Sequence, residues 1–416
     1  MRSAVLLAAL LFSTTANAQQ PIDPKVQARI DRILKGTPLI DGHNDLPWEL
    51  RENHDYRVEG LESGSAKREK PLMTDMARLR SGRVGAQLWS VYINAATKGD
   101  EAIRQTIEQI DAVDRLVKAY PGDLEWARTA DDIIHIHKAG RIASMAGIEG
   151  GDQTGNDLAA LRQFYRLGAR YMTLTHSKTT DWADSATDAP KHGGLSPFGV
   201  KVVGEMNRLG MLVDLSHVSE EAMADALDAT KAPVIFSHSS ARAVNHHPRN
   251  VPDSILQRLP ANGGVVMINF YTGFVAEDYR QWNAHRLAEE ARLKSLNPGD
   301  PKLVEREMAA WSAANPAPLA TIGQVADHID HVAKIAGHDH VGIGADLDGI
   351  DLAPEGLASV DGYPLVFAEL IRRGWSDDNL AKLAGGNFLR ALRRAEAVAA
   401  SMKDVPPALD KLAPAP

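Results

Sequence analysis

The sequence predicts a single (β/α)8 barrel, because strand-like and helix-like segments alternate eight times along its 416 residues. Several of the strand-like segments end in a side chain that can bind a metal or move a proton. In this fold, functional side chains gather at the C-terminal ends of the strands. The eight apolar stretches predicted as strands are 38–45, 84–91, 142–149, 171–176, 211–217, 234–238, 265–270 and 341–346.

The first predicted strand ends in the pair His43 and Asp45. Side chains alternate along a strand, so residues two apart point to the same face. We therefore expect the first strand to present two metal-ligand side chains on one side. Five later strand ends carry comparable residues, which are Glu149, His176, His217, His238 and Asp346.

Helical periodicity fills most of the intervals between these strands. In 157–168, apolar residues recur at spacings of three and four, and Gly168 is placed to end the helix. Two segments depart from the alternation. The polar stretch 51–70 is either a loop covering the barrel mouth or a solvated surface loop. The charged, tryptophan-containing stretch 277–314 predicts a helical insertion between strands 7 and 8, with a lid or a subunit contact as the less favoured interpretation.

Histidines away from the strand ends are interpreted differently. His328 and His331 share one face of a predicted helix that precedes the eighth strand. That helix belongs to the outer ring, so we expect a solvated face there.

Composition restricts the chemistry. A formal net charge of -8 without a long basic run argues against a nucleic-acid partner. The absence of cysteine excludes disulfides and thiolate ligands, which leaves nitrogen and oxygen donors. Such donors suit Zn, Mn or Co ions.

The N-terminus has the layout of a secretory signal. Arg2 precedes an apolar core at 4–12, and Ala16-Asn17-Ala18 offers small residues for cleavage near Ala18. We expect a signal peptide at 1–18, one barrel domain at 19–403 and a Pro/Ala-rich tail at 404–416. The mature protein is then exported, periplasmic or secreted, without a stable membrane anchor.

Five of the candidate residues fit a pair of divalent ions sharing one carboxylate: His43, Asp45, Glu149, His217 and His238. Glu149 is the natural bridge, because Gly147, Gly150 and Gly151 let the backbone approach closely. A hydroxide held between two cations is a nucleophile at neutral pH. Asp346 is placed to carry its proton to a leaving amine, and it is favoured over Asp348 because the apolar strand stops there.

For two further residues, His176 and Arg249, the sequence allows both a functional and a structural role. His176 either steadies an oxyanion or binds metal, or it is a hydrogen-bonded histidine at a strand end. Arg249, in the loop after the sixth strand, either grips a substrate carboxylate or is an exposed loop arginine.

From about Pro38 to Arg390 the chain resembles the membrane (renal) dipeptidase family, peptidase family M19, among the amidohydrolase-like barrels. The ordered motifs that carry the resemblance are 41–48 (DGHNDLPW), 87–92 (QLWSVY), 148–151 (IEGG), 174–177 (LTHS), 214–219 (DLSHVS), 236–240 (FSHSS), 249–253 (RNVPD) and 344–349 (GADLDG).

This resemblance implies a binuclear zinc dipeptidase with Zn2+, two ions per chain. The implied ligands are His43 and Asp45 for one ion, His217 and His238 for the other, and Glu149 as the bridge. The other implied site residues are Asp346 for proton transfer, His176 near the scissile carbonyl, Arg249 for the substrate C-terminal carboxylate, and Tyr271 in the pocket wall.

The expected reaction is hydrolysis of a small-molecule dipeptide, including dipeptides with a D-residue at the C-terminal position. The alternative is a related amidohydrolase acting on an N-acyl amino acid, a β-lactam or a secondary-metabolite peptide. Family analogy favours a non-covalent homodimer. Two departures from the family pattern bear on specificity, namely Asp152, where some members have histidine, and the loop 180–184.

Overall fold

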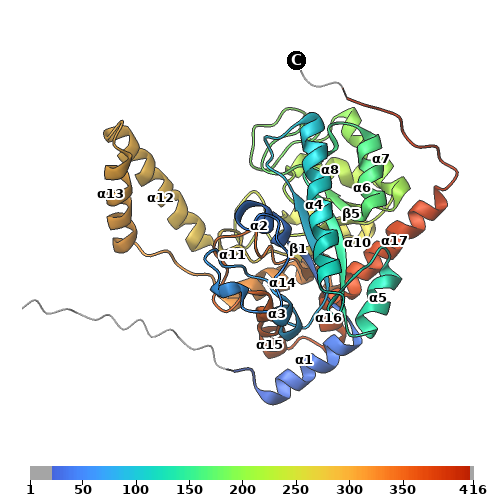
Figure 1. Cartoon of the computed structure of the whole chain (residues 1–416), viewed down its shortest axis with the longest axis horizontal. Coiled ribbons are helices and arrows are strands. Elements are labelled where there is room, and N and C mark those ends of the chain that lie inside the picture. Colours follow the sequence, from blue (N-terminus) through green and yellow to red (C-terminus); the bar gives the residue numbers. More distant parts are fainter. Residues whose placement is uncertain (1–20, 413–416) are drawn as a thin grey trace, which may run out of the picture.

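The computed structural model describes residues 21–412 as a closed barrel of eight parallel strands surrounded by helices (Figure 1), which confirms the predicted fold. Around the barrel the strand order is β2-β1-β9-β8-β7-β6-β5-β4, and pairing of β4 with β2 closes it. The barrel strands are β1 (Leu39–Asn44), β2 (Val84–Tyr92), β4 (Ile142–Glu149), β5 (Ala169–Thr173), β6 (Leu212–Asp214), β7 (Val234–Phe236), β8 (Val265–Ile268) and β9 (Val341–Ile343).

A ninth strand, β3 (Leu124–Trp126), was not predicted. It pairs in parallel with the start of β4, at Ile142 to Ser144. Further along β4, pairing with β5 begins at Ala146. The short strand therefore pairs only with the N-terminal part of β4, and the closed barrel still consists of eight strands.

Side chains from alternating positions fill the barrel interior. Ile40, Leu88 and Met145 belong to this inner cluster, together with the fully buried ring of Tyr171. A Cβ atom at Gly147 would lie 1.9 Å from Cζ of Tyr171, so only glycine leaves room for this ring. A second, larger apolar layer joins the strands to the surrounding helices.

The helix predicted at 157–168 is α6 (Leu158–Leu167), and its end signals work as expected. The Asp157 side chain accepts from the backbone N–H of Ala159, and Gly168 ends the helix with φ of 131°. The remaining α-helices are α1 (Pro24–Gly36), α2 (Leu46–Asn53), α3 (Met76–Ser81), α4 (Gly99–Ala119), α5 (Ala130–Lys138), α7 (Pro197–Leu209), α8 (Glu220–Ala229), α9 (Asp253–Leu256), α10 (Leu259–Asn262), α11 (Thr272–Val275), α12 (Glu277–Leu296), α13 (Pro301–Ala314), α14 (Ile322–Ala336), α15 (Tyr363–Arg372), α16 (Asp377–Ala381) and α17 (Asn387–Ser401).

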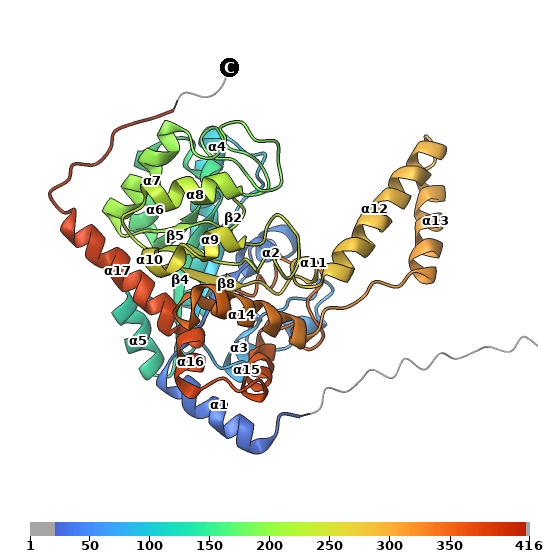
Figure 2. The same ribbon diagram turned by 180° about the vertical axis from the view of Figure 1, so that it is seen from behind.

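The predicted helical insertion is present between the last two strands. Helices α12 and α13 form a hairpin that projects away from the barrel in both views (Figures 1 and 2). The first turn of α12 follows α11, which lies after β8. Across residues 21–412 we find no helix with the length and apolarity needed to cross a membrane.

His328 departs from the expected solvated helix face, because it is completely buried on α14. Its Nδ1 accepts the backbone N–H of Ala241 at 3.0 Å, and its Nε2 lies 3.0 Å from the carbonyl oxygen of Val275. The ring thus joins the segment after β7 to the end of α11. His331 remains partly exposed and pairs with Asp253 at 2.7 Å.

The chain ends are described only in part. The predicted signal peptide at 1–18 lies outside the described residues. Of the predicted tail, residues 404–412 are described, and the part from Ala408 onward contacts the α6 region. Arg162 donates to the carbonyl oxygen of Ala408 at 2.7 Å, and Lys411 pairs with Asp157 at 2.5 Å.

Candidate metal centre

The strand ends place the predicted residues around one cavity of about 420 Å³. His43 lies within β1, Glu149 is the last residue of β4, and His217 and His238 follow the ends of β6 and β7. The lining residues are Asp45, Trp48, Tyr92, Glu149, His176, His217, His238, Arg249, Tyr271, Phe274, Asp346, Gly349, Ile350 and Asp351. His43 is fully buried beside this set. All nine predicted site residues thus meet at the same end of the barrel.

Glu149 occupies the centre of the cluster. Its Oε1 lies 3.0 Å from Nε2 of His217 and 3.3 Å from Nε2 of His238. Its Oε2 lies 3.4 Å from Nε2 of His43, which in turn lies 3.3 Å from Asp45. The two oxygens of one carboxylate therefore face two different sets of donors, as a bridging ligand requires.

The donor set fits divalent cations. The buried Nε2 of His43 has no hydrogen-bond partner among the described residues. The Nε2 atoms of His217 and His238 face each other at 2.9 Å. Imidazole nitrogens and carboxylate oxygens converging at such distances are the ligands of catalytic zinc and similar ions.

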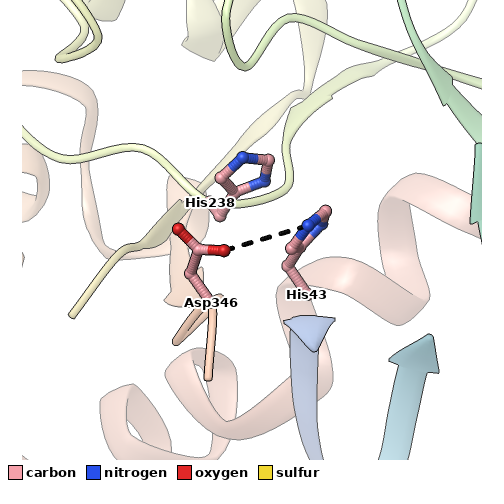
Figure 3. Close-up of side chains that lie close together, drawn as sticks. All are labelled: His43, His238 and Asp346. Carbon is pink, nitrogen blue, oxygen red and sulfur yellow. Dashed lines mark ion pairs between the residues drawn. The ribbon is translucent and has the colours of Figure 1, made fainter. Parts of the chain in front are cut away.

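A third potential group includes Asp346. His43, His238 and Asp346 offer ligand atoms that all lie within 4.8 Å of one another. Figure 3 shows the Asp346 carboxylate directed toward the imidazole of His43, and the ion pair between them measures 4.0 Å. Asp346 therefore lies within reach of both the ligands and the cavity.

The cluster sets the protonation of its members. Burial lowers the pKa of the His217 and His238 imidazoles well below the ordinary value, which favours the neutral form that binds metal. Burial raises the pKa of Asp346 well above its ordinary range, and the carboxylates of Asp45 and Glu149 raise it further. For Glu149 burial acts in the same direction, but the surrounding imidazoles prevail and hold its pKa well below the usual range.

The neighbouring carboxylate of Asp348 points elsewhere. It accepts the backbone N–H of Met73 at 2.6 Å and does not line the cavity. Burial raises its pKa to about 6. By contrast, Asp346 accepts from the Asn269 side chain at 2.8 Å. Asn269 was not predicted as a site residue, although its amide side chain and its position directly after β8 were the available signal in the sequence.

The remaining predicted residues form the cavity wall. The Nε2 atom of His176 lies 3.6 Å from Glu149, and its ring centroid lies 4.2 Å from that of His217. Arg249 is only 3% exposed and lies over the ring of Phe274 at 5.1 Å. Tyr271 packs edge-on against the same ring, with the centroids 4.9 Å apart.

Two further aromatic side chains, Trp48 and Tyr92, also line the cavity. Trp48 meets Tyr92 edge-on at 4.7 Å, and Tyr92 lies 4.5 Å from His176. Both residues occur in motifs noted in the sequence, but nothing in the sequence indicated that they converge. These two rings give the cavity an apolar surface beside its carboxylate and imidazole side chains.

Backbone geometry at the site is unusual. His217, Asp346 and Asp348 have positive φ of 70°, 65° and 64°. Residues other than glycine adopt this region rarely, and it occurs preferentially at functional sites. Gly150, after the bridging glutamate, has φ of 125°, a conformation that favours glycine.

The two departures noted in the sequence lie outside the cavity lining. Asp152 is 7% exposed and pairs with Lys98 at 2.5 Å. In the loop 180–184, Asp184 accepts backbone N–H groups of Lys191 and Gly194. The two regions pack closely against each other, since a Cβ atom at Gly151 would lie 2.3 Å from the Trp182 ring.

Comparisons with known proteins agree with this geometry. The model of the membrane dipeptidase family, peptidase family M19, matches residues 27–405. Dipeptidase tcpJ of Claviceps purpurea (strain 20.1) is 41% identical over 384 residues, covering 90% of this chain and 81% of that protein.

Solved structures are similar over nearly the same span. The probable dipeptidase PvdM from Pseudomonas aeruginosa has a TM-score of 0.76 at 26% identity, covering 90% of this chain and 99% of that chain. A metallopeptidase from Rhodobacter sphaeroides, liganded with a phosphinate mimic of the dipeptide L-Ala-D-Ala, shares the fold with a TM-score of 0.71 at 24% identity, covering 86% and 99%.

Proposed function

Because this chain belongs to peptidase family M19 and is a metal-dependent dipeptidase, we propose that it hydrolyses dipeptides with two zinc ions. His43 and Asp45 would hold one ion, His217 and His238 the other, and Glu149 would bridge them. The main support for a bridged pair of ions is the position of the Glu149 carboxylate. Its Oε1 faces His217 and His238, and its Oε2 faces His43. When bound, the ions lower the pKa of water and polarise the peptide carbonyl.

The proposed proton carrier is Asp346. Its raised pKa and its place at the cavity wall suit a group that accepts a proton from the attacking water. The same carboxyl then gives that proton to the nitrogen of the leaving amine. Asn269 holds the carboxylate from its other side at 2.8 Å, which limits its rotation.

Two cavity residues are proposed to orient the substrate. His176 lies beside the metal ligands and is suited to donate a hydrogen bond to the scissile carbonyl oxygen as charge develops there. Arg249 is proposed to bind the C-terminal carboxylate. Within residues 21–412, its guanidinium makes only long hydrogen bonds of 3.4 Å, to Ser239 and to the carbonyl oxygen of His238. A buried guanidinium so weakly satisfied is suited to receive a substrate anion.

The preferred substrate is proposed to be a free dipeptide, with either hand tolerated at the C-terminal residue. The Rhodobacter sphaeroides metallopeptidase is liganded with a mimic of L-Ala-D-Ala, which supports acceptance of a D-residue at that position. An assay comparing an L-L dipeptide, an L-D dipeptide and an N-acetylated amino acid tests it. Faster cleavage of the N-acetylated compound would replace the proposal with the other amidohydrolase function.

We also propose that residues 1–18 are a signal peptide removed before the barrel domain at 19–403 reaches its exported location. Arg2, the apolar core at 4–12 and the small residues before Gln19 support this. Mass spectrometry of the exported protein should find Gln19 at the N-terminus. An N-terminal Met1 in that fraction would contradict the proposal.

A further inference from the structure

Two buried residues that are not predicted ligands form a hydrogen-bond chain to Nδ1 of His238, with Ser237 in contact with the imidazole and Asp214 behind Ser237. Ser237 Oγ lies 2.8 Å from Nδ1 of His238 and 2.6 Å from Oδ2 of Asp214. Asp214 is the last residue of β6, and Ser237 directly follows β7. Both residues are fully buried, so no solvent competes for these contacts.

The direction of these hydrogen bonds follows from the surroundings of Asp214. Its carboxylate accepts from Thr173 Oγ1 at 2.5 Å, from Ser237 Oγ at 2.6 Å, and from the backbone N–H groups of Ser237 at 2.8 Å and Ser216 at 3.1 Å. A carboxylate surrounded by donors in this way acts as an acceptor only. The single hydroxyl proton of Ser237 is therefore donated to Asp214.

The tautomer of His238 follows from that direction. Because the Ser237 proton is already used, its oxygen can only accept from His238, so Nδ1 carries the hydrogen. A neutral imidazole has one N–H, and Nε2 is then left with its lone pair free. Nε2 lies 3.3 Å from Glu149 Oε1 and 2.9 Å from His217 Nε2, inside the metal centre.

We propose that Asp214 and Ser237 are positioning residues that hold His238 as the Nδ1–H tautomer and so present Nε2 to the metal. This inference rests on the proposed function, in which His238 is a ligand. Partners of this kind set the orientation and basicity of metal-binding histidines, and their loss typically costs about 10- to 100-fold in metal affinity.

The other two ligand imidazoles lack such a directed contact. Nδ1 of His43 lies 2.9 Å from the Tyr171 hydroxyl, but that hydroxyl can donate or accept. Nδ1 of His217 has no partner among the described residues. Among residues 21–412, only the carboxylate of Asp214 fixes the direction of a hydrogen-bond chain that reaches a nitrogen of a proposed ligand imidazole.

Zinc affinity measured by chelator competition tests the proposal in Ser237→Ala. We expect affinity for at least one of the two ions to fall about 10- to 100-fold, with a changed visible absorption spectrum after Co2+ substitution. The matched control is Ser144→Ala, which removes another fully buried hydroxyl, one with no hydrogen-bond partner among the described residues. It should leave the affinity and the spectrum unchanged.

Asp214→Asn gives a sharper expectation. An amide at 214 can donate to Ser237, so the Ser237 hydroxyl is free to donate to Nδ1 of His238. The imidazole proton then moves to Nε2 and blocks the ligand position. We expect zinc affinity to fall further in this variant than in Ser237→Ala.

Histidine 15N NMR on metal-free wild-type protein reads the tautomer directly, with the His238 signal identified by its loss in His238→Gln. A proton on Nδ1 supports the proposal, and this result decides it even where a variant fails to fold. A proton on Nε2, or unchanged metal affinity and Co2+ spectrum in Ser237→Ala, overturns it. Wild-type protein that binds no zinc would instead overturn the proposed function.

Discussion

Replacing Asp346 with asparagine tests the proposed proton transfer. The amide has nearly the same shape and can still accept from Asn269, which lies 2.8 Å from the Asp346 carboxylate. It cannot, however, carry a proton between the water and the leaving amine. Removing a positioned general acid–base typically costs about 10²- to 10⁴-fold in rate. This corresponds to about 3–5 kcal/mol of transition-state stabilisation.

Steady-state kinetics on an L-L dipeptide, with metal content measured on the same sample, separates chemistry from metal loss. We expect kcat to fall by that factor while KM and the metal content stay near wild type. The matched control is Asp348→Asn, since Asp348 is also buried but accepts from Met73 and does not line the cavity. Asp346→Asn turnover within a few-fold of wild type, with metal retained, would refute the reasoning.

Three further outcomes follow from particular contacts. Arg249→Ala should raise KM for dipeptides by about 10- to 150-fold, because a hydrogen bond to a charged group is worth about 1.5–3 kcal/mol; an unchanged KM would remove the carboxylate contact. Gly147→Ala should lower the free energy of unfolding by about 1–3 kcal/mol in urea titrations, because its Cβ would lie 1.9 Å from the Tyr171 ring. The control is Gly204→Ala in α7, where an added Cβ meets open space, and it should leave the protein at least as stable as wild type. Burial lowers the pKa of His328 to about 4 from 6.5, so its neutral form contributes stability fully above pH 6.5 that is lost as pH falls toward 4. His328→Gln should remove about 3 kcal/mol of this acid-side dependence, and an unchanged pH profile of stability would contradict the assignment.

The barrel could be predicted because each buried parallel strand is a short apolar run, and the alternation with helices leaves few other folds. The strand ends were less predictable. β6 stops at Asp214, so His217 lies three residues beyond it, in a left-handed conformation that no periodicity indicates. β3 was missed because it has only three residues and pairs with only the start of β4.

The other features that the sequence did not predict arise where side chains from distant segments meet in the folded chain. Trp48 and Tyr92 come from different segments of the sequence, and only the closed barrel brings them to one cavity. The barrel likewise brings Asn269 against Asp346, 77 residues further along the chain. His328 looked solvated because its helix belongs to the outer ring. The segments that bury it, at Ala241 and Val275, come from loops whose path the sequence does not reveal.

Metal content measured together with dipeptide hydrolysis tests the central claim most directly. The mature chain from Gln19 should contain two zinc ions per molecule and cleave an L-L dipeptide, and a chelator should abolish cleavage until zinc is restored. Full activity in metal-free protein, or a zinc-loaded protein that cleaves no dipeptide, would contradict the account.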